Sequence, residues 1–184
     1  MGMKISRCLL AFTALGFLGV RGVCEDTAQP EKVLPRFHEV APGIYRGGQP
    51  TRVGFDLLKQ RGVRTIINLR REKDEKELVE GLGLKYVYIP LDTRDEVSAN
   101  AIKTFLTTVS DPASQPVFVH CHRGADRTGL MVGLYRIAQQ GWSAQQAYDE
   151  ARGVGMRWWY RGLKRQLYEF AEKTTSLQPS TSGQ

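Results

Sequence analysis

The sequence predicts an α/β fold in which a mainly parallel central sheet is flanked by helices. Two observations lead to this prediction. Short apolar segments with strand composition alternate with helix-type segments along the chain, an order typical of a parallel sheet. The 184 residues, of which 41% are hydrophobic and 24% charged, are enough for one domain with a buried core. This length and composition exclude a fully disordered, collagen-like or disulfide-dense chain.

Four short segments have the composition of strands. Gly43–Arg46 is the first, and the turn at Gly47–Pro50 closes it. Thr65–Leu69 is β-branched and mostly apolar, as expected of a strand in the centre of a sheet. Lys85–Ile89 and Val117–His120 are the other two, and Val117–His120 leads directly into a polar loop.

Helices are expected between the strands. Thr51 and Ser98 are suited to cap two of them, and Gly62 and Gly141 are suited to end two. The charged segment Arg70–Glu80 is predicted to be an exposed helix whose charges face the solvent. The predicted helices are Val53–Gln60, Arg70–Glu80, Ser98–Val109, Thr128–Gln140, Ser143–Arg152 and Trp158–Lys173.

Met1–Cys24 has the layout of a secretory signal peptide. Basic residues precede the apolar run Cys8–Val20, whose thirteen residues are fewer than the roughly 20 that span a bilayer. Gly22 and Cys24 are small residues placed before a cut ahead of Glu25. We therefore expect an exported protein, periplasmic or secreted; the alternative is an uncleaved amphiphilic anchor.

The remainder is predicted to be a single domain between two loose ends. We expect a polar lead-in over residues 25–39, a domain over residues 40–173 and a disordered tail over residues 174–184. Residues 25–184 hold 23 Lys and Arg against 19 Asp and Glu, because residues 1–24 hold three basic side chains and no acidic one. This mild positive charge suits an anionic substrate and does not indicate nucleic acid. Membrane contact is expected only through residues 1–24, if they are retained.

Cys121 is the only cysteine beyond residue 24, so the exported chain has no partner for an internal disulfide. Five residues separate it from Arg127, in a loop that enters from a strand and leaves into a helix. Such a loop can curl until its N–H groups surround a tetrahedral oxyanion at the positive end of the helix dipole. Gly124 permits the tight curl, and the Arg127 guanidinium can bind two phosphate oxygens at once.

The same surroundings favour an ionised thiol. Free thiols have a pKa of about 8.5, and helix N-termini and nearby cations lower thiol pKa values to roughly 3.5–7.5. Cys121 is therefore predicted to act as a thiolate nucleophile toward phosphorus. Thr128 is placed to hydrogen-bond the sulfur when it leaves, and His120 to brace the loop through backbone contacts.

Several segments resemble one family. Val117–Gly129 contains His-Cys-x5-Arg-Thr-Gly and resembles the signature of the cysteine-dependent protein tyrosine phosphatases. Gly43–Pro50 is similar to the Y-R-x-x-Q-P element of the atypical dual-specificity branch, and Thr65–Arg70 to its second strand. Tyr135–Trp142 resembles the following helix in exported bacterial members. The resemblance covers residues 40–173 and implies a protein tyrosine phosphatase-like fold.

The resemblance implies an enzyme, a phosphoric monoester hydrolase that requires no metal or cofactor. Cys121 would form a phosphocysteine, which water then hydrolyses, while Arg127 and the loop N–H groups hold the transferring group. The implied substrate is phosphotyrosine in a phosphoprotein, with phosphoserine and phosphothreonine as further candidates. The alternative is a phosphoinositide or inositol phosphate at the same site. The residues implied to bind the phosphate are His122, Arg123, Gly124, Ala125, Asp126 and Arg127.

The family draws the leaving-group proton from an Asp on a separate loop. Asp92, Asp95 and Glu96 lie in the loop that follows Ile89, and Asp92 is preferred because its surroundings resemble the acid loop of small members. Asp95 is the alternative if the loop is longer, and Glu96 is third. All three could instead be solvated carboxylates near the next helix.

Two departures from the family bear on the substrate. Lipid-directed members often carry Lys-Asp in the middle of the loop, whereas Ala125 precedes Asp126 here, which weakens a phosphoinositide assignment. Arg123 adds a cation that favours multiply phosphorylated ligands. Asp126 could orient arginine side chains or activate water, or it could simply be solvated.

Residues 152–165 combine cations with aromatic rings. They are interpreted either as a substrate rim or membrane-facing patch, or as a helix that packs Trp158 or Trp159 on the sheet. His38 and His122 are not at metal-ligand spacing, and no metal is expected. Other classes considered are a phosphate-binding module without catalysis and a sulfurtransferase, both of which the Cys121–Arg127 spacing disfavours.

Overall fold

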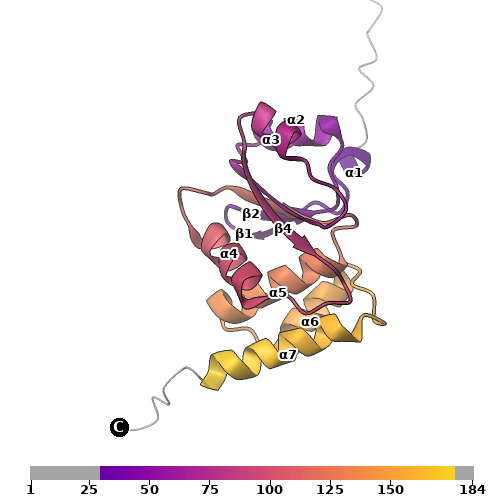
Figure 1. Cartoon of the computed structure of the whole chain (residues 1–184), viewed down its shortest axis with the longest axis vertical. Helices are drawn as coiled ribbons and strands as arrows, with labels where there is room; N and C mark the ends of the chain where they lie inside the picture. The colour runs from indigo at the N-terminus through magenta and orange to yellow at the C-terminus, as the bar shows by residue number, and fades with distance from the viewer. Residues whose placement is uncertain (1–29, 177–184) are drawn as a thin grey trace, which may run out of the picture.

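The computed structural model describes residues 30–176, and Figure 1 shows three layers, with helices on both sides of a central sheet. The strands are β1 (His38–Ala41), β2 (Ile44–Gly47), β3 (Thr65–Arg70), β4 (Lys85–Leu91) and β5 (Val117–His120). The helices are α1 (Pro30–Val33), α2 (Arg52–Gln60), α3 (Lys76–Gly81), α4 (Ala99–Ser110), α5 (Asp126–Gln140), α6 (Ala144–Gly153) and α7 (Arg161–Ser176).

The sheet has the strand order β1-β2-β5-β3-β4. Neighbouring strands from β2 to β4 are parallel, and only β1 runs antiparallel, against β2. The prediction of a mainly parallel α/β sheet flanked by helices is therefore confirmed. Each of the four parallel strands ends at the same edge of the sheet, so the loops that follow them meet there, as in other open parallel sheets.

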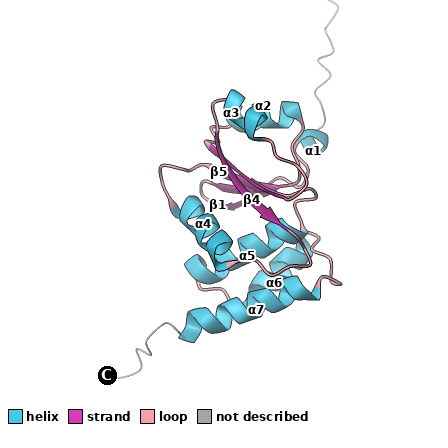
Figure 2. Ribbon diagram, in the orientation of Figure 1, coloured by secondary structure: helices cyan, strands magenta, loops and turns pink. Residues whose placement is uncertain are grey.

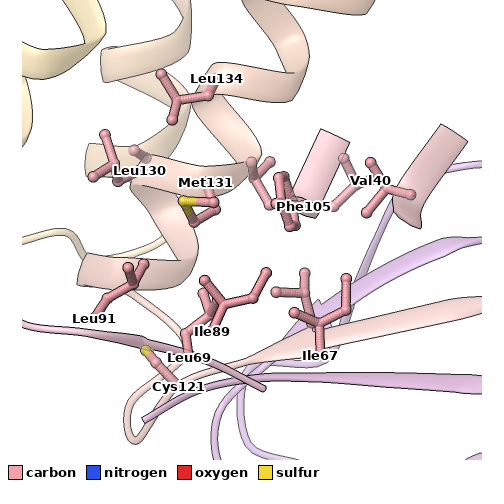
Figure 3. Close-up of a cluster of buried hydrophobic side chains, with 14 of the residues drawn as sticks. Val40, Ile67, Leu69, Ile89, Leu91, Phe105, Cys121, Leu130, Met131 and Leu134 are labelled. Carbon is pink, nitrogen blue, oxygen red and sulfur yellow. The ribbon is translucent and has the colours of Figure 1, made fainter. Parts of the chain in front are cut away.

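Two hydrophobic clusters fill the spaces between the layers. Helices α1, α2 and α3 lie on one side of the sheet and α4 to α7 on the other, where α6 and α7 pack on α5 (Figure 2). Ile66 packs in the first cluster and its neighbour Ile67 in the second, because successive side chains of a strand point to opposite faces. Cys121 lies at the margin of the second cluster, where β5 ends (Figure 3).

The beginning of the domain differs from the expected loose lead-in over residues 25–39. Pro30–Val33 is helical, and Val33 and Leu34 are buried against the first cluster. His38 begins β1, an edge strand that the sequence analysis did not predict. The expected signal segment, Met1–Cys24, lies outside the described residues. Within residues 30–176, every helix falls short of the length and hydropathy needed to cross a bilayer.

The charged segment after β3 is not the helix that was predicted over Arg70–Glu80. Arg70 still belongs to β3, and the helix begins only at Lys76. Between Arg70 and Lys76, side chains form hydrogen bonds with backbone groups that a helix would otherwise use. Asn68 Nδ2 donates to the Lys73 carbonyl at 2.8 Å, and the Glu75 N–H donates to Tyr86 Oη at 3.1 Å. These bonds from the flanking strands β3 and β4 hold the segment as an irregular loop.

The last helix begins and ends three residues later than expected, at Arg161 and Ser176. The expected disordered tail therefore starts too early, since Thr174 to Ser176 are helical and Thr174 Oγ1 donates to the Phe170 carbonyl at 2.8 Å. Trp158 and Trp159 precede the helix and are 60% and 54% exposed. The interpretation in which one of them packs on the sheet is wrong.

Candidate active site

A polar pocket of about 410 Å³ opens where the parallel strands end. Residues that follow β3, β4 and β5 contribute to it, together with the loop between α6 and α7. Five of its side chains are arginines and three are carboxylic acids, so positive charge predominates. The lining residues are Arg71, Glu72, Asp92, Thr93, Arg94, Cys121, His122, Arg123, Asp126, Arg127, Arg157 and Tyr160.

Cys121 lies at the bottom of this pocket, directly after β5, and is 2% exposed. The Gly124 N–H donates to its Sγ at 3.2 Å. The loop then enters α5, which Ala125 precedes without offering a capping side chain. Free N–H groups at the start of a helix favour an anion, and the arrangement therefore suits a thiolate and a bound oxyanion.

Gly124 shapes the loop. Its φ of +72° is a left-handed conformation, and a Cβ on it would lie 2.3 Å from the carbonyl carbon of Gly47 and 2.4 Å from the nitrogen of Gly48. The loop and the end of β2 are therefore in backbone-to-backbone contact. A hydrogen bond also joins the two segments, because the Gln49 N–H donates to the His122 carbonyl at 3.0 Å.

The guanidinium of Arg127 connects the loop to the ends of two strands. Its Nη1 donates to the Leu91 carbonyl at 3.2 Å and to the Leu69 carbonyl at 3.4 Å. Glu72 Oε2 lies 3.6 Å from the same nitrogen. These contacts hold Arg127 at the pocket in a fixed orientation. A planar guanidinium needs such an orientation to form two parallel hydrogen bonds to phosphate oxygens.

Of the three candidate acids, the structure brings only Asp92 into the pocket. Arg71 Nη1 lies 2.9 Å from Asp92 Oδ2, and the Arg94 N–H donates to Asp92 Oδ1 at 2.9 Å. That backbone hydrogen bond, followed by the charges of Arg71 and other arginines, lowers the pKa of Asp92. Asp95 and Glu96 do not line the pocket, and the Glu96 carboxylate pairs with Arg165 at 2.9 Å.

Asp126 is buried, so the interpretation in which it is merely solvated is wrong. Its carboxylate accepts from the Arg157 N–H at 2.9 Å, from Arg157 Nη2 at 2.8 Å and from Arg157 Nε at 3.1 Å. Arg123 lies further away, with Nη1 at 3.7 Å. Asp126 therefore orients an arginine, one of the two roles expected of it.

The other predicted loop residues divide between the pocket and the interior. His122 and Arg123 line the pocket, whereas Gly124 and Ala125 are buried beside it. Thr128 is fully buried, and its Oγ1 has no hydrogen-bond partner among the described residues. An unpaired buried hydroxyl costs free energy, and a sulfur or phosphate oxygen in the loop would satisfy it.

His120 is fully buried beneath the loop, and its Nε2 lies 3.4 Å from Oε2 of the buried Glu75. Burial lowers the pKa of His120 to about 3 and raises the pKa of Glu75. His120 is therefore neutral at neutral pH. Gln49 Nε2 also donates to Glu75 Oε1, and Gln49 Oε1 accepts from Arg70 at 2.9 Å.

Arg157 and Tyr160 line the pocket from the loop before α7, and both belong to residues 152–165, which the sequence analysis interpreted as a candidate substrate rim. Two other residues of this site were not assigned a role. Arg46 and Gln49 hold the loop from behind, and both belong to the Y-R-x-x-Q-P element. That element was the available signal: two polar residues at the end of a short strand, which the structure places against the phosphate loop.

A sheet of this order, with a Cys-x5-Arg loop between its central strand and a helix, defines the protein tyrosine phosphatase-like class of fold. Residues 23–158 match the family described as "DSP-PTPase phosphatase fused to NAD+ Kinase". The chain belongs to this dual-specificity phosphatase family, an atypical branch of the protein tyrosine phosphatase superfamily.

Curated relatives carry names of two kinds. Inositol diphosphatase DSP2 of Oryza sativa subsp. japonica is 33% identical over 121 residues, 62% of this chain and 59% of the relative. Inositol diphosphatase SIW14 of Saccharomyces cerevisiae is 32% identical over 132 residues, 66% of this chain and 47% of the relative. Dual specificity protein phosphatase TpbA of Pseudomonas aeruginosa is 27% identical over 118 residues, which are 64% of this chain and 54% of the relative. The chain thus spans about half the length of these relatives.

Solved structures agree on the fold. The crystal structure of P. aeruginosa TpbA gives a TM-score of 0.64 at 22% identity, covering 76% of this chain and 91% of that chain. The core catalytic domain of SIW14 from S. cerevisiae, described as a PP-IP phosphatase, gives a TM-score of 0.61 at 24% identity. The match covers 77% of this chain and 94% of that chain.

Proposed function

We propose that the chain is a phosphatase that forms a phosphocysteine on Cys121. The observation that carries the proposal is the geometry of the loop, in which the Gly124 N–H contacts the Cys121 sulfur at 3.2 Å and the Arg127 guanidinium lies at the same pocket. An oxyanion that binds there meets N–H donors, a helix N-terminus and a cation at once. Membership of the family supports the same chemistry.

In the first step the Cys121 thiolate attacks phosphorus in line with the leaving oxygen. The S–P bond forms as the P–O bond breaks, and Asp92 gives its proton to the leaving oxygen. Arg127 and the loop N–H groups hold the three phosphoryl oxygens in the transition state. Asp92 is assigned this role because it is the one candidate acid of its loop that lines the pocket.

In the second step a water molecule attacks the phosphocysteine. Asp92, now ionised, takes the water proton, and the P–S bond breaks to release inorganic phosphate and the thiolate. The unpaired Thr128 hydroxyl, buried beside the loop, donates to the departing sulfur. These groups supply the nucleophile, the acid and base, and the charge stabilisation from the chain itself.

The pocket lining favours a substrate that carries several phosphates. Beyond Arg127, four arginines line it, and Arg94 offers a guanidinium to a second phosphate. Charge-assisted bonds to phosphate are strong when the donor is an arginine fork. We therefore propose an inositol phosphate or another densely phosphorylated molecule as one substrate class of this pocket, which agrees with the names of DSP2 and SIW14.

Phosphotyrosine is the second candidate, and one observation favours it. Tyr160 places an aromatic ring in the pocket lining, where it can contact the ring of a phosphotyrosine. A phosphotyrosine complex of P. aeruginosa TpbA is known, at 22% identity to this chain. The same pocket could thus accept a phosphoprotein.

A substrate panel with matched variants tests both parts of the proposal. Inositol polyphosphates and diphosphates, a phosphotyrosyl peptide and p-nitrophenyl phosphate are assayed with wild type, Cys121→Ser and Arg94→Ser. Cys121→Ser should be inactive on every substrate and still bind vanadate; activity above a tenth of wild type would overturn the phosphocysteine. Arg94→Ser should raise KM for the polyphosphates and spare p-nitrophenyl phosphate. An equal rise in KM for all substrates would contradict the proposal that Arg94 binds a second phosphate.

Export remains a proposal of its own. The layout of Met1–Cys24 supports removal of this segment during secretion. Protein recovered from the periplasmic or secreted fraction should then have a mass that begins near Glu25. Full-length protein confined to the cytosol would contradict export.

A further inference from the structure

Arg46 is an arginine in the interior of the domain. It lies in β2 and is 2% exposed. Its Nη2 donates to the Gly124 carbonyl at 3.0 Å, whereas Nε and Nη1 have no hydrogen-bond partner among residues 30–176. Burying a cation with two unsatisfied donors is costly, and such a group is retained where an anion compensates it.

The carboxylate with the largest electrostatic effect on Arg46 is already engaged. Glu150 of α6 accepts from Arg136 of α5, with Nη2 at 2.5 Å and Nε at 3.2 Å from its oxygens. Burial lowers the pKa of Arg46 to about 10, so the guanidinium still carries its charge at neutral pH. After Glu150, Cys121 is the group whose negative charge, when its thiol is ionised, acts on Arg46.

Gly124 joins the two residues directly. Its carbonyl accepts from Arg46, and its N–H donates to the Cys121 sulfur at 3.2 Å. The backbone of Gly47 and Gly48 closes against the same residue, so no side chain fits there. The position of the N–H that contacts the sulfur is therefore fixed by the end of β2, from which Arg46 comes.

We infer that Arg46 is a positioning residue for the nucleophile, which orients Gly124 toward the sulfur and provides the buried positive charge that stabilises the Cys121 thiolate. This inference rests on the proposed function of Cys121. It assigns a role to the arginine of the Y-R-x-x-Q-P element. The exposed arginines of the pocket bind substrate, whereas Arg46 lies behind the loop and acts on the enzyme before substrate arrives.

The rate of alkylation by iodoacetamide against pH measures the thiolate directly, without substrate. Arg46→Lys keeps a charge and a donor, Arg46→Gln keeps a donor only, and Arg46→Met keeps neither. The two neutral variants should raise the pH midpoint of alkylation by about one unit or more, the usual effect of losing a nearby opposite charge. Arg46→Lys should stay close to wild type. Wild-type midpoints in both neutral variants would overturn the inference.

Arg36→Met is the matched control. Arg36 also donates to a carbonyl of the loop, that of Arg123 at 3.2 Å, but it is exposed. Its removal should leave the midpoint unchanged, and a shift equal to that of Arg46→Met would show that any loop contact suffices. Urea unfolding of each variant identifies those that are folded.

A measurement on the wild-type protein covers the case in which the neutral variants do not fold. A buried charge is screened little by salt, whereas exposed charges are screened strongly. The alkylation midpoint should therefore change little between low and high KCl; a rise of a full unit would assign thiolate stabilisation to the exposed arginines and overturn the inference. The proposed function is tested separately, because phosphatase activity in the Cys121→Ser variant would contradict it.

Discussion

Arg71 and Asp92 form an ion pair across the mouth of the candidate active site, with Arg71 Nη1 2.9 Å from Asp92 Oδ2. The hydrogen bond from the Arg94 N–H, and then the charge of Arg71, lower the pKa of Asp92, so its carboxylate is ionised in the free protein at neutral pH. A general acid must be protonated when the leaving group departs. An incoming phosphate competes for Arg71 and adds negative charge beside Asp92, so substrate itself favours the protonated form of the acid.

Arg71→Met should move the basic limb of the pH–rate profile to higher pH. Arg71 contributes to the low pKa of Asp92, and its loss lets Asp92 stay protonated at a pH at which the wild type is ionised. Because Arg71 is exposed, the shift in kcat/KM should be about half a unit to one unit. Arg52→Met removes an arginine from another ion pair, with Asp56, and should leave the profile unchanged. An unmoved limb in Arg71→Met would contradict the coupling.

Asp92→Asn should slow substrates with poor leaving groups by roughly 10²–10⁴-fold, the usual effect of a positioned acid. A substrate with an acidic phenol should be slowed far less, because its leaving group needs no proton. The basic limb of the profile should also flatten. Asp95→Asn is the control, since that residue does not line the pocket. If Asp95→Asn shows the leaving-group dependence instead, the acid has been assigned to the wrong residue.

Gly124→Ala should cost far more stability than Gly141→Ala. Both glycines have positive φ, +72° and +67°, but a Cβ at position 141 meets nothing within 4 Å, whereas one at position 124 strikes the backbone of Gly47 and Gly48. Gly141→Ala should cost about 1–2 kcal/mol from backbone strain alone and remain active. Gly124→Ala should lose more than that in urea unfolding, together with phosphatase activity. Equal losses would argue against the contact.

His120 should make the protein less stable as the pH falls below neutrality. Its pKa is about 3 in the folded chain and about 6.5 when unfolded, so between these values the unfolded state binds a proton that the folded state does not. This group alone lowers the free energy of unfolding by about 1.4 kcal/mol per pH unit below 6.5. Glu75, whose pKa is raised, offsets part of this loss at lower pH.

Urea unfolding of wild type and His120→Asn between pH 7.5 and 5.5 isolates the contribution of His120. The variant should lose less stability on acidification than wild type does. His38→Asn, which removes an exposed histidine, should follow the wild type. Parallel pH dependences in wild type and His120→Asn would mean that His120 takes up its proton over the same pH range in the folded and unfolded protein, and would contradict the prediction.

The sequence predicted the fold class and the phosphate loop because their signals are local. Val117–His120 is apolar and followed at once by a Cys-x5-Arg segment, so strand, loop and helix can be recognised from consecutive residues. The partner of Asp126 could not be found in this way. Arg157 reaches it across 31 residues, and only the packing of α6 and α7 on α5 brings the two together.

Side-chain contacts with other elements of the fold also explain the errors in secondary structure. The segment after Arg70 has a helical composition, but Asn68 and Tyr86 bind its backbone groups from neighbouring strands. Trp158 and Trp159 were expected at the start of the last helix, and one interpretation packed one of them on the sheet because aromatic residues are usually buried. They lie instead in the loop before α7, where Arg157 of the same loop is bound to Asp126.

The exposed tryptophans give the protein an optical probe of its own pocket. Trp159 lies with its ring centroid 5.6 Å from the Arg157 guanidinium carbon, and Arg157 lines the pocket. A phosphate that draws Arg157 toward itself changes the surroundings of the indole and hence its emission. The chain has three tryptophans, so replacing Trp142 with Phe leaves a signal from the Trp158–Trp159 pair alone. Combined with Cys121→Ser, this replacement gives an unlabelled, inactive protein in which ligand occupancy can be followed continuously.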